Sequence, residues 1–126
     1  MRQTSDLLYT SEHEWISIDD TVATIGITNF AQSELGDIIF IELPNVGDEF
    51  ESNDVFGTIE AVKTVADLYM PLSGKIIEIN PNIEDAPENV NNSPYDDGWI
   101  VKIDISANAD KSELLNEESY KKLING

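Results

Sequence analysis

Short segments in which apolar and polar residues alternate, each ended by turn-forming residues, recur along most of this chain. Such patterns predict β-strands with one buried face. The predicted strands cover residues 15–18, 21–27, 37–41, 75–79 and 99–105, and residues 55–70 are β-rich throughout with an interruption at Gly57. A chain of 126 residues is long enough for one core. We therefore expect a single, mostly β domain over residues 1–126, a small barrel or sandwich with its β core at about 14–105.

Two segments have helical features. In the first, Asn29 is the expected N-cap, Gln32 can reach back three residues to it, and Gly36 suits the left-handed end of a helix. In the second, Asp110 and Glu113 form a capping pair, and acidic residues precede basic ones, which predicts a helical tail at about 110–125. Between them, residues 80–98 contain three prolines among many Asn and Asp residues, which predicts an irregular segment.

The balance of charge excludes one class of partner and favours another. Twenty-five acidic residues against seven basic ones give a formal net charge of −18. Such a surface repels nucleic-acid phosphates, keeps a protein soluble and monomeric, and favours basic partner surfaces. We therefore expect a monomer that binds no nucleic acid.

Other absences restrict the chemistry and the location. The chain has no cysteine, so any thiol chemistry has to come from a cofactor. No stretch approaches the roughly 18 consecutive apolar residues of a membrane span, and no secretory or lipidation signal is found. We expect a cytoplasmic protein of bacterial type that binds no membrane, a mature mitochondrial form being the alternative.

One lysine stands alone in the acidic part of the sequence. Between Gln3 and Gly74, Lys63 is the single basic residue against fourteen carboxylates. It is either a solvated strand residue beside an acid such as Glu60, or a lysine reserved for covalent modification, because a flexible primary amine readily forms amides and Schiff bases. Periodicity does not choose between the two, and it predicts no turn at Lys63.

The remaining candidates for chemistry are weaker. His13 lies between Glu12 and Glu14 and resembles a carboxylate-oriented general base, but no nucleophile motif accompanies it. The acidic pairs at 84–85 and 96–97 lack the spacing of a calcium loop, and no glycine pattern suits a phosphate. We expect neither a catalytic residue nor a metal site.

Several motifs, in order and in register, resemble those of the glycine cleavage H proteins. The resemblance runs from about Tyr9 to Ile103, and its central motif contains Lys63. The matching segments are 13–15, 22–28, 31–38, 42–44, 57–63, 67–69, 71–74, 90–95 and 98–103. In many members Ser and Ala stand where this chain has Ala61 and Thr64, and these small exchanges keep the segment slim.

The resemblance implies a fold and a set of site residues. It implies a barrel-sandwich hybrid of two small sheets, with a short internal helix, a C-terminal helical segment and Lys63 at the tip of a hairpin. Lys63 then carries covalently attached lipoate as N6-lipoyllysine. The remaining implied residues are Glu60, Gly47 and Gly74 for recognition by the lipoylating enzyme, and Glu14, Asp67 and His13 beside the loaded arm.

The implied function is that of a non-enzymatic carrier. It shuttles the aminomethyl group of glycine from a pyridoxal-phosphate glycine decarboxylase (P protein) to a tetrahydrofolate-dependent aminomethyltransferase (T protein). A dihydrolipoamide dehydrogenase (L protein) reoxidises the arm. Two alternatives stay open: a lipoyl-relay or stress-linked H-like protein, and a lipoyl domain of a 2-oxo acid dehydrogenase. The latter usually has Asp or Met before its lysine, where this chain has Val62.

Overall fold

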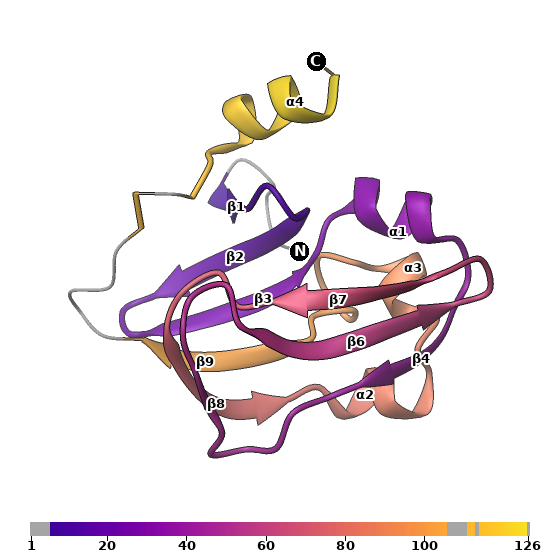
Figure 1. Cartoon of the computed structure of the whole chain (residues 1–126), viewed down its shortest axis with the longest axis horizontal. Helices are drawn as coiled ribbons and strands as arrows, with labels where there is room; N and C mark the ends of the chain where they lie inside the picture. The colour runs from indigo at the N-terminus through magenta and orange to yellow at the C-terminus, as the bar shows by residue number, and fades with distance from the viewer. Residues whose placement is uncertain (1–5, 106–110, 113, 126) are drawn as a thin grey trace.

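A computed structural model describes residues 6–105, 111–112 and 114–125 (Figure 1). These residues form short strands and four helices. The strands are β1 (Leu8–Tyr9), β2 (Glu14–Asp19), β3 (Val22–Ile27), β4 (Ile38–Glu42), β5 (Glu49–Phe50), β6 (Val55–Ala61), β7 (Val65–Tyr69), β8 (Gly74–Ile79) and β9 (Val101–Ile105). The helices are α1 (Asn29–Leu35), α2 (Pro81–Asp85), α3 (Asn89–Asn92) and α4 (Glu117–Asn125).

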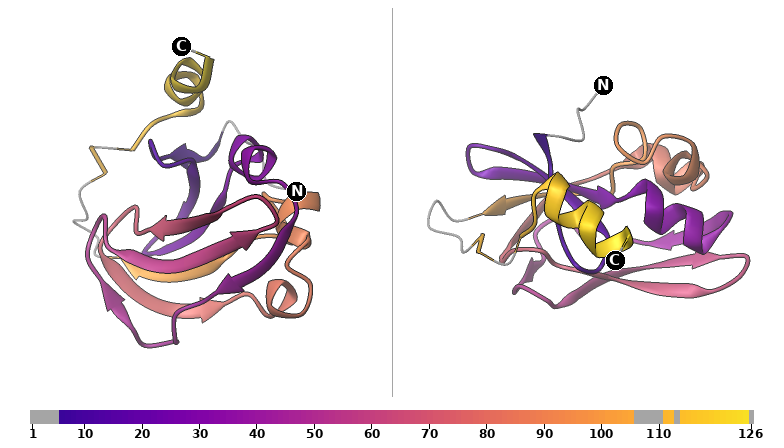
Figure 2. Two further views of the ribbon diagram at one scale, coloured as in Figure 1. Left: turned by 45° about the vertical axis from the view of Figure 1, so that its right-hand side comes forward. Right: turned by 90° about the horizontal axis from the view of Figure 1, so that it is seen from above.

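The strands build two antiparallel sheets. One has the order β1-β2-β3-β9-β8-β5, and the other has the order β4-β6-β7. Figure 2 shows β6 and β7 lying over β8 and β9, so that the sheets enclose one core. That core contains Ile25, Ile59, Leu68, Ile76 and Ile103, all of them buried. The predicted mostly β fold of two small sheets is confirmed.

The predicted strands are found with their ends shifted by one or two residues, and the β-rich stretch 55–70 is two strands, β6 and β7. Gly57 does not interrupt β6; it lies at a register shift opposite β7. Its Cβ would stand 2.6 Å from the carbonyl oxygen of Glu42, so this close strand approach needs glycine. Strands β1 and β5 were not predicted, because two residues carry no periodicity.

The prediction that residues 80–98 are irregular is wrong in part, because they contain α2 and α3. Pro81 takes the first helical position, where its missing N–H costs nothing, and the Asn80 side chain accepts a hydrogen bond from the Asn82 N–H at 2.9 Å. The residues that suggested a loop are therefore helix-starting residues.

Helix α1 begins with a different cap from the one expected. The N-cap is Thr28 rather than Asn29: the Thr28 side chain accepts from the Ala31 N–H at 3.2 Å. Gln32 does reach back, but its amide donates to the Asn29 side chain at 2.8 Å. Gly36 ends the helix at φ +81°, as its position predicted.

The C-terminal helix is shorter than expected. Helix α4 begins at Glu117, and the expected capping pair of Asp110 and Glu113 lies outside the described residues. Tyr120 attaches α4 to the β domain: its ring is buried and stacks on Tyr9 with centroids 4.7 Å apart. Within the described part of the chain, no helix has the length and apolar character needed to cross a membrane.

Candidate functional site

Lys63 lies at the tip of the hairpin that joins β6 and β7. The Ala61 N–H donates to the Thr64 carbonyl at 2.8 Å and closes the turn. Residues 62–65 are exposed, and within the described residues Lys63 forms neither an ion pair nor a hydrogen bond. The tip therefore presents a primary amine to solvent on a short, hydrogen-bonded support.

The aliphatic part of the Lys63 side chain, here called its stem, lies against the C-terminal end of α1. A Cβ built on Gly36 would lie 3.5 Å from Lys63 Cδ and 3.6 Å from Cε. The hairpin is also hydrogen-bonded to Asp37, the residue after Gly36: the Val62 N–H donates to the Asp37 carbonyl at 3.0 Å. The segment after α1 thus sets where the lysine stem lies.

The side chain of Asn91 fixes the end of α1 and the residues after it by hydrogen bonds. No role was predicted for this residue. Its amide donates to the Gly36 carbonyl at 2.8 Å and to the Gln32 side chain at 3.0 Å. Its Oδ1 accepts from the Ile38 N–H at 2.9 Å. Asn91 lies in α3, within the stretch 80–98 that was expected to be irregular. Periodicity therefore gave no signal for it.

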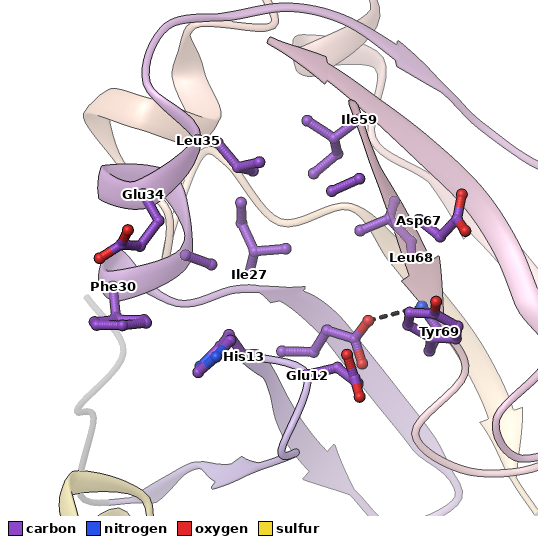
Figure 3. Close-up of a pocket in the computed structure, with 13 residues that line it drawn as sticks. Glu12, His13, Ile27, Phe30, Glu34, Leu35, Ile59, Asp67, Leu68 and Tyr69 are labelled. Atoms are coloured by element: carbon purple, nitrogen blue, oxygen red, sulfur yellow. Dashed lines mark hydrogen bonds between the residues drawn. The ribbon is translucent and has the colours of Figure 1, made fainter. Parts of the chain in front are cut away.

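A cavity of about 530 Å³ opens beside the hairpin, between α1, β7 and the start of β2 (Figure 3). Its walls are mainly apolar, and acidic side chains lie at several places around it, with Glu34 on the α1 side and Asp67 on the β7 side (Figure 3). The lining residues are Ile27, Phe30, Ala31, Leu35, Ile59, Ala66, Leu68 and Tyr69, with Glu12, His13, Glu14, Glu34 and Asp67. Leu35, one of the lining residues, directly precedes Gly36, against which the Lys63 side chain lies.

Glu14 is a buried carboxyl in this cavity, with only 2% of its surface exposed. β7 is an edge strand, and its Tyr69 N–H donates to Glu14 Oε2 at 2.7 Å. The Thr10 hydroxyl donates to Oε1 at 3.2 Å. Burial raises the pKa of Glu14 from 4.5 to about 8, although these hydrogen bonds oppose the shift. Glu14 is therefore mostly protonated at neutral pH.

This burial predicts a pH-dependent stability difference between wild type and Glu14→Gln. Between pH 4.5 and about 8 the unfolded chain has lost a proton that the folded chain keeps, so wild-type stability falls as pH rises. Glutamine does not titrate. The free energy of unfolding of the variant, minus that of wild type, should increase by up to about 1.4 kcal/mol per pH unit in this window. Urea titrations at several pH values measure it; a pH-independent difference would contradict the buried neutral carboxyl.

Asp67 and His13 lie differently from Glu14. Asp67 is exposed and alternates with buried Leu68 along β7, and Figure 3 shows its carboxylate pointing away from His13 across the cavity. His13, at φ +68°, has its Nδ1 2.9 Å from the Tyr120 hydroxyl and its ring centroid 4.8 Å from that of Phe30. The structure brings all three to one cavity, in which Glu14 is buried and Asp67 is exposed.

The residues expected to serve recognition are divided between two places. Glu60 is exposed in β6, close to the hairpin tip. Gly74 begins β8, and the Gly47 N–H donates to the Ile76 carbonyl at 2.7 Å. In Figures 1 and 2 the start of β8 lies at the opposite end of the molecule from the β6–β7 tip. The two glycines are therefore not beside Glu60 and Lys63.

Glu12, for which no role was predicted, also lines the cavity, and its position next to His13 in sequence was the available signal. Within the described residues no group of three or more His, Asp and Glu side chains is arranged to hold a metal ion.

Comparisons with known proteins agree with one another. The family model described as "Glycine cleavage H-protein" matches residues 7–126. The glycine cleavage system H protein of Staphylococcus epidermidis is 53% identical over 120 residues, which cover 95% of each chain. That of Carboxydothermus hydrogenoformans is 52% identical over 119 residues, covering 94% of this chain and 92% of the other.

The fold comparison gives the same result. The crystal structure of a glycine cleavage system H protein from Mycobacterium marinum matches with a TM-score of 0.90 and 35% sequence identity. The match covers 97% of this chain and 98% of that one.

Proposed function

The chain belongs to the glycine cleavage H-protein family, a non-catalytic carrier component of the glycine cleavage system, and on that premise we propose that Lys63 is its point of lipoyl attachment. One observation carries the proposal: the exposed amine of Lys63 ends a closed hairpin whose stem lies beside an apolar cavity. An amine free of ion pairs within the described residues can be acylated without breaking a stabilising contact.

The residues around Lys63 fit a lipoyl group. The apolar walls of the cavity, including Leu35, Ile59 and Leu68, suit a hydrocarbon chain and a dithiolane ring. When attached, the group would supply the sulfur chemistry needed to carry an aminomethyl fragment, which this cysteine-free chain lacks.

Within that cavity each side chain has a physical task. The apolar walls keep water away from the cargo. Glu14 would accept a charge-assisted hydrogen bond from the ammonium end of the cargo; that cation would lower the pKa of Glu14, whose proton would pass to water. Asp67 adds a carboxylate at the solvent-exposed edge, and His13 shapes the wall through its contact with Phe30.

The partners follow from the glycine cleavage system. As individual partners we assign the pyridoxal-phosphate glycine decarboxylase, the aminomethyltransferase, the dihydrolipoamide dehydrogenase and a lipoylating enzyme. Glu60 is read by the last of these. The roles of Gly47 and Gly74 in that recognition, the monomeric state, the cytoplasmic location and a lipoyl-relay activity stay predictions. The match along the whole chain favours this carrier over a lipoyl domain of a 2-oxo acid dehydrogenase.

Loading of the isolated protein tests this function. The lipoylated chain, with its lipoyl group in the oxidised dithiolane form, is mixed with glycine and glycine decarboxylase, and the intact mass is followed. We expect the lipoylated protein to gain one aminomethyl group and the unlipoylated protein to gain none. Acceptance of acyl groups from a 2-oxo acid dehydrogenase, without acceptance of the aminomethyl group, would overturn the assignment.

A further inference from the structure

The hydroxyl group of Tyr120 extends from α4 to the wall of the cavity. Its oxygen lies 2.9 Å from His13 Nδ1 and 2.7 Å from Thr28 Oγ1. His13 lines the cavity, and its ring lies next to that of Phe30 (Figure 3). Thr28 is the N-cap of α1 and has no exposed surface. The three hydrogen-bonded side chains therefore connect the C-terminal helix, the start of α1 and the cavity.

The hydrogen atoms of this chain of groups can be arranged in two ways. Thr28 Oγ1 accepts from the Ala31 N–H, and within the described residues its only other partner is the Tyr120 oxygen. In the first arrangement the Thr28 hydroxyl donates to Tyr120 and Tyr120 donates to His13 Nδ1, so that every proton has an acceptor. In the second, His13 Nδ1–H donates to Tyr120 and Tyr120 donates to Thr28, which leaves the buried Thr28 proton without an acceptor. Because buried donors are rarely left unpaired, the first arrangement is favoured, and the neutral His13 ring carries its proton on Nε2.

Both partners of the central hydrogen bond are held in place. Burial raises the pKa of Tyr120, so its hydroxyl keeps the proton that it donates, and its ring stacks on Tyr9. The backbone of His13 is fixed at φ +68°: its N–H donates to the Thr10 carbonyl at 3.1 Å, and its carbonyl accepts from the Thr28 N–H at 3.0 Å. The ring of His13 and the hydroxyl of Tyr120 therefore meet from two anchored positions.

This arrangement is the reverse of the one that makes a histidine a general base. In a catalytic histidine oriented by a carboxylate, the carboxylate accepts from Nδ1–H and the lone pair of Nε2 is free to take a proton. In this chain Nδ1 accepts from a hydroxyl and Nε2 carries the proton. His13, which its acidic sequence neighbours made a candidate general base, thus has no free lone pair while Tyr120 donates to it.

We propose that Tyr120 is a positioning residue, which holds His13 in the Nε2–H tautomer and so prevents its ring from taking a proton from the cargo, a role that rests on the proposed function. The C-terminal helix is then part of the device that preserves the loaded arm.

The chemistry of an aminomethyl group on sulfur explains why a free base in the cavity would be harmful. Such a group is lost after its ammonium gives up a proton: the nitrogen lone pair forms a C=N bond, the C–S bond breaks with its electron pair going to sulfur, and water converts the released fragment to ammonia and formaldehyde. A free imidazole lone pair would accept the first proton. Glu14 would not prevent this transfer, because the imidazolium would replace the ammonium as the cation in the same cavity.

The ring nitrogens of His13 test the tautomer in the unlipoylated full-length protein. Because His13 is the sole histidine, ¹⁵N-histidine labelling gives one pair of ring signals. At about pH 8.5, where an ordinary histidine is neutral, we expect Nδ1 at the chemical shift of an unprotonated nitrogen and Nε2 at that of a protonated one. Tyr120→Phe keeps the ring that stacks on Tyr9 and removes only the hydroxyl, so the two shifts should move toward each other as the tautomers mix. A protonated Nδ1 in wild type, or equal shifts in wild type and variant, would overturn the proposal.

The rate at which the loaded protein releases ammonia and formaldehyde without a partner tests the protective role. Tyr120→Phe should release them about tenfold faster, which is less than the roughly 10²–10⁴-fold of a well-placed general base because only part of the population would have a free Nε2 lone pair. The matched control is Tyr95→Phe. It also removes a hydroxyl that binds the start of α1, where it accepts from the Asn29 N–H at 2.9 Å, but Tyr95 is not among the residues that line the cavity. Its release rate should equal that of wild type.

The His13→Asn background shows whether Tyr120 acts through His13. Asparagine tolerates the positive φ of this position, and its amide is not a base. In this background Tyr120→Phe should cause no further acceleration. An equal acceleration there, a faster release from Tyr95→Phe, or no acceleration by Tyr120→Phe in the otherwise wild-type chain would overturn the protective role.

Failure of the proposed function gives a different result. If wild type accepts no aminomethyl group, the carrier assignment fails and the protective role fails with it, whereas the nitrogen shifts still decide whether Tyr120 sets the tautomer. The wild-type shifts need no variant, so they decide this even if Tyr120→Phe lowers the stability of the fold.

Discussion

Replacement of Lys63 by arginine should abolish lipoyl attachment completely and leave the melting temperature unchanged. Arginine keeps the positive charge, but a guanidinium that stays protonated is not a nucleophile for acyl transfer. The side chain is exposed and its aliphatic stem can still lie over Gly36, so the fold loses no buried contact. Intact mass after incubation with a lipoylating enzyme, together with a thermal melt, measures both expectations.

Lys75→Arg is the matched control for this experiment. Lys75, like Lys63, is an exposed lysine, but it lies in strand β8, and its replacement should leave lipoylation complete. A lipoyl group gained by the Lys63 variant, or lost from the Lys75 variant, would contradict the assignment of the modified residue.

The second large effect concerns the lifetime of the loaded protein. Glu14→Gln should shorten that lifetime by about 10- to 100-fold, because a shielded charge-assisted hydrogen bond contributes roughly 1.5–3 kcal/mol. Asp67→Asn should have a much smaller effect, because the Asp67 carboxylate is exposed and screened by water. The two single variants therefore separate a buried acceptor from a surface acid in the same cavity.

The measurement is the rate at which the aminomethylated protein releases its cargo without a partner, at one pH and one salt concentration. Lipoylation and reoxidation should be unchanged in both variants. Decay rates of wild type and Glu14→Gln that agree would leave the carrier function standing and remove this account of the cavity. A larger effect of Asp67→Asn than of Glu14→Gln would place the cargo at the outer edge.

The strand pattern was predictable because alternation follows directly from which face of a strand is buried. The turn at the β6–β7 tip was not, because residues 61–64 contain none of the usual turn formers, and the turn depends on tertiary ties such as the bond between Val62 and Asp37. Helix α2 was hidden by Pro81 and Asn80, which indicate a loop when they are counted but start a helix in this order.

The residues of the candidate site were likewise predictable only in part from the sequence. Lys63 was identifiable because it is a lone cation in an acidic stretch, and the family resemblance chose between its two interpretations. The burial of Glu14 depends on packing between β2, α1 and β7, which are far apart in sequence, so no local pattern reports it. The outward direction of Asp67 was available from its alternation with Leu68. Asn91 acts through backbone atoms of a distant segment, which sequence does not reveal.

The measurement that tests the central claim most directly is peptide mapping by mass spectrometry of the protein purified from its native cells. The account predicts one lipoyl group per chain, on the peptide that contains Lys63 and on no other. A lipoyl group on Lys75 or Lys102, or a fully active carrier without one on Lys63, would contradict it.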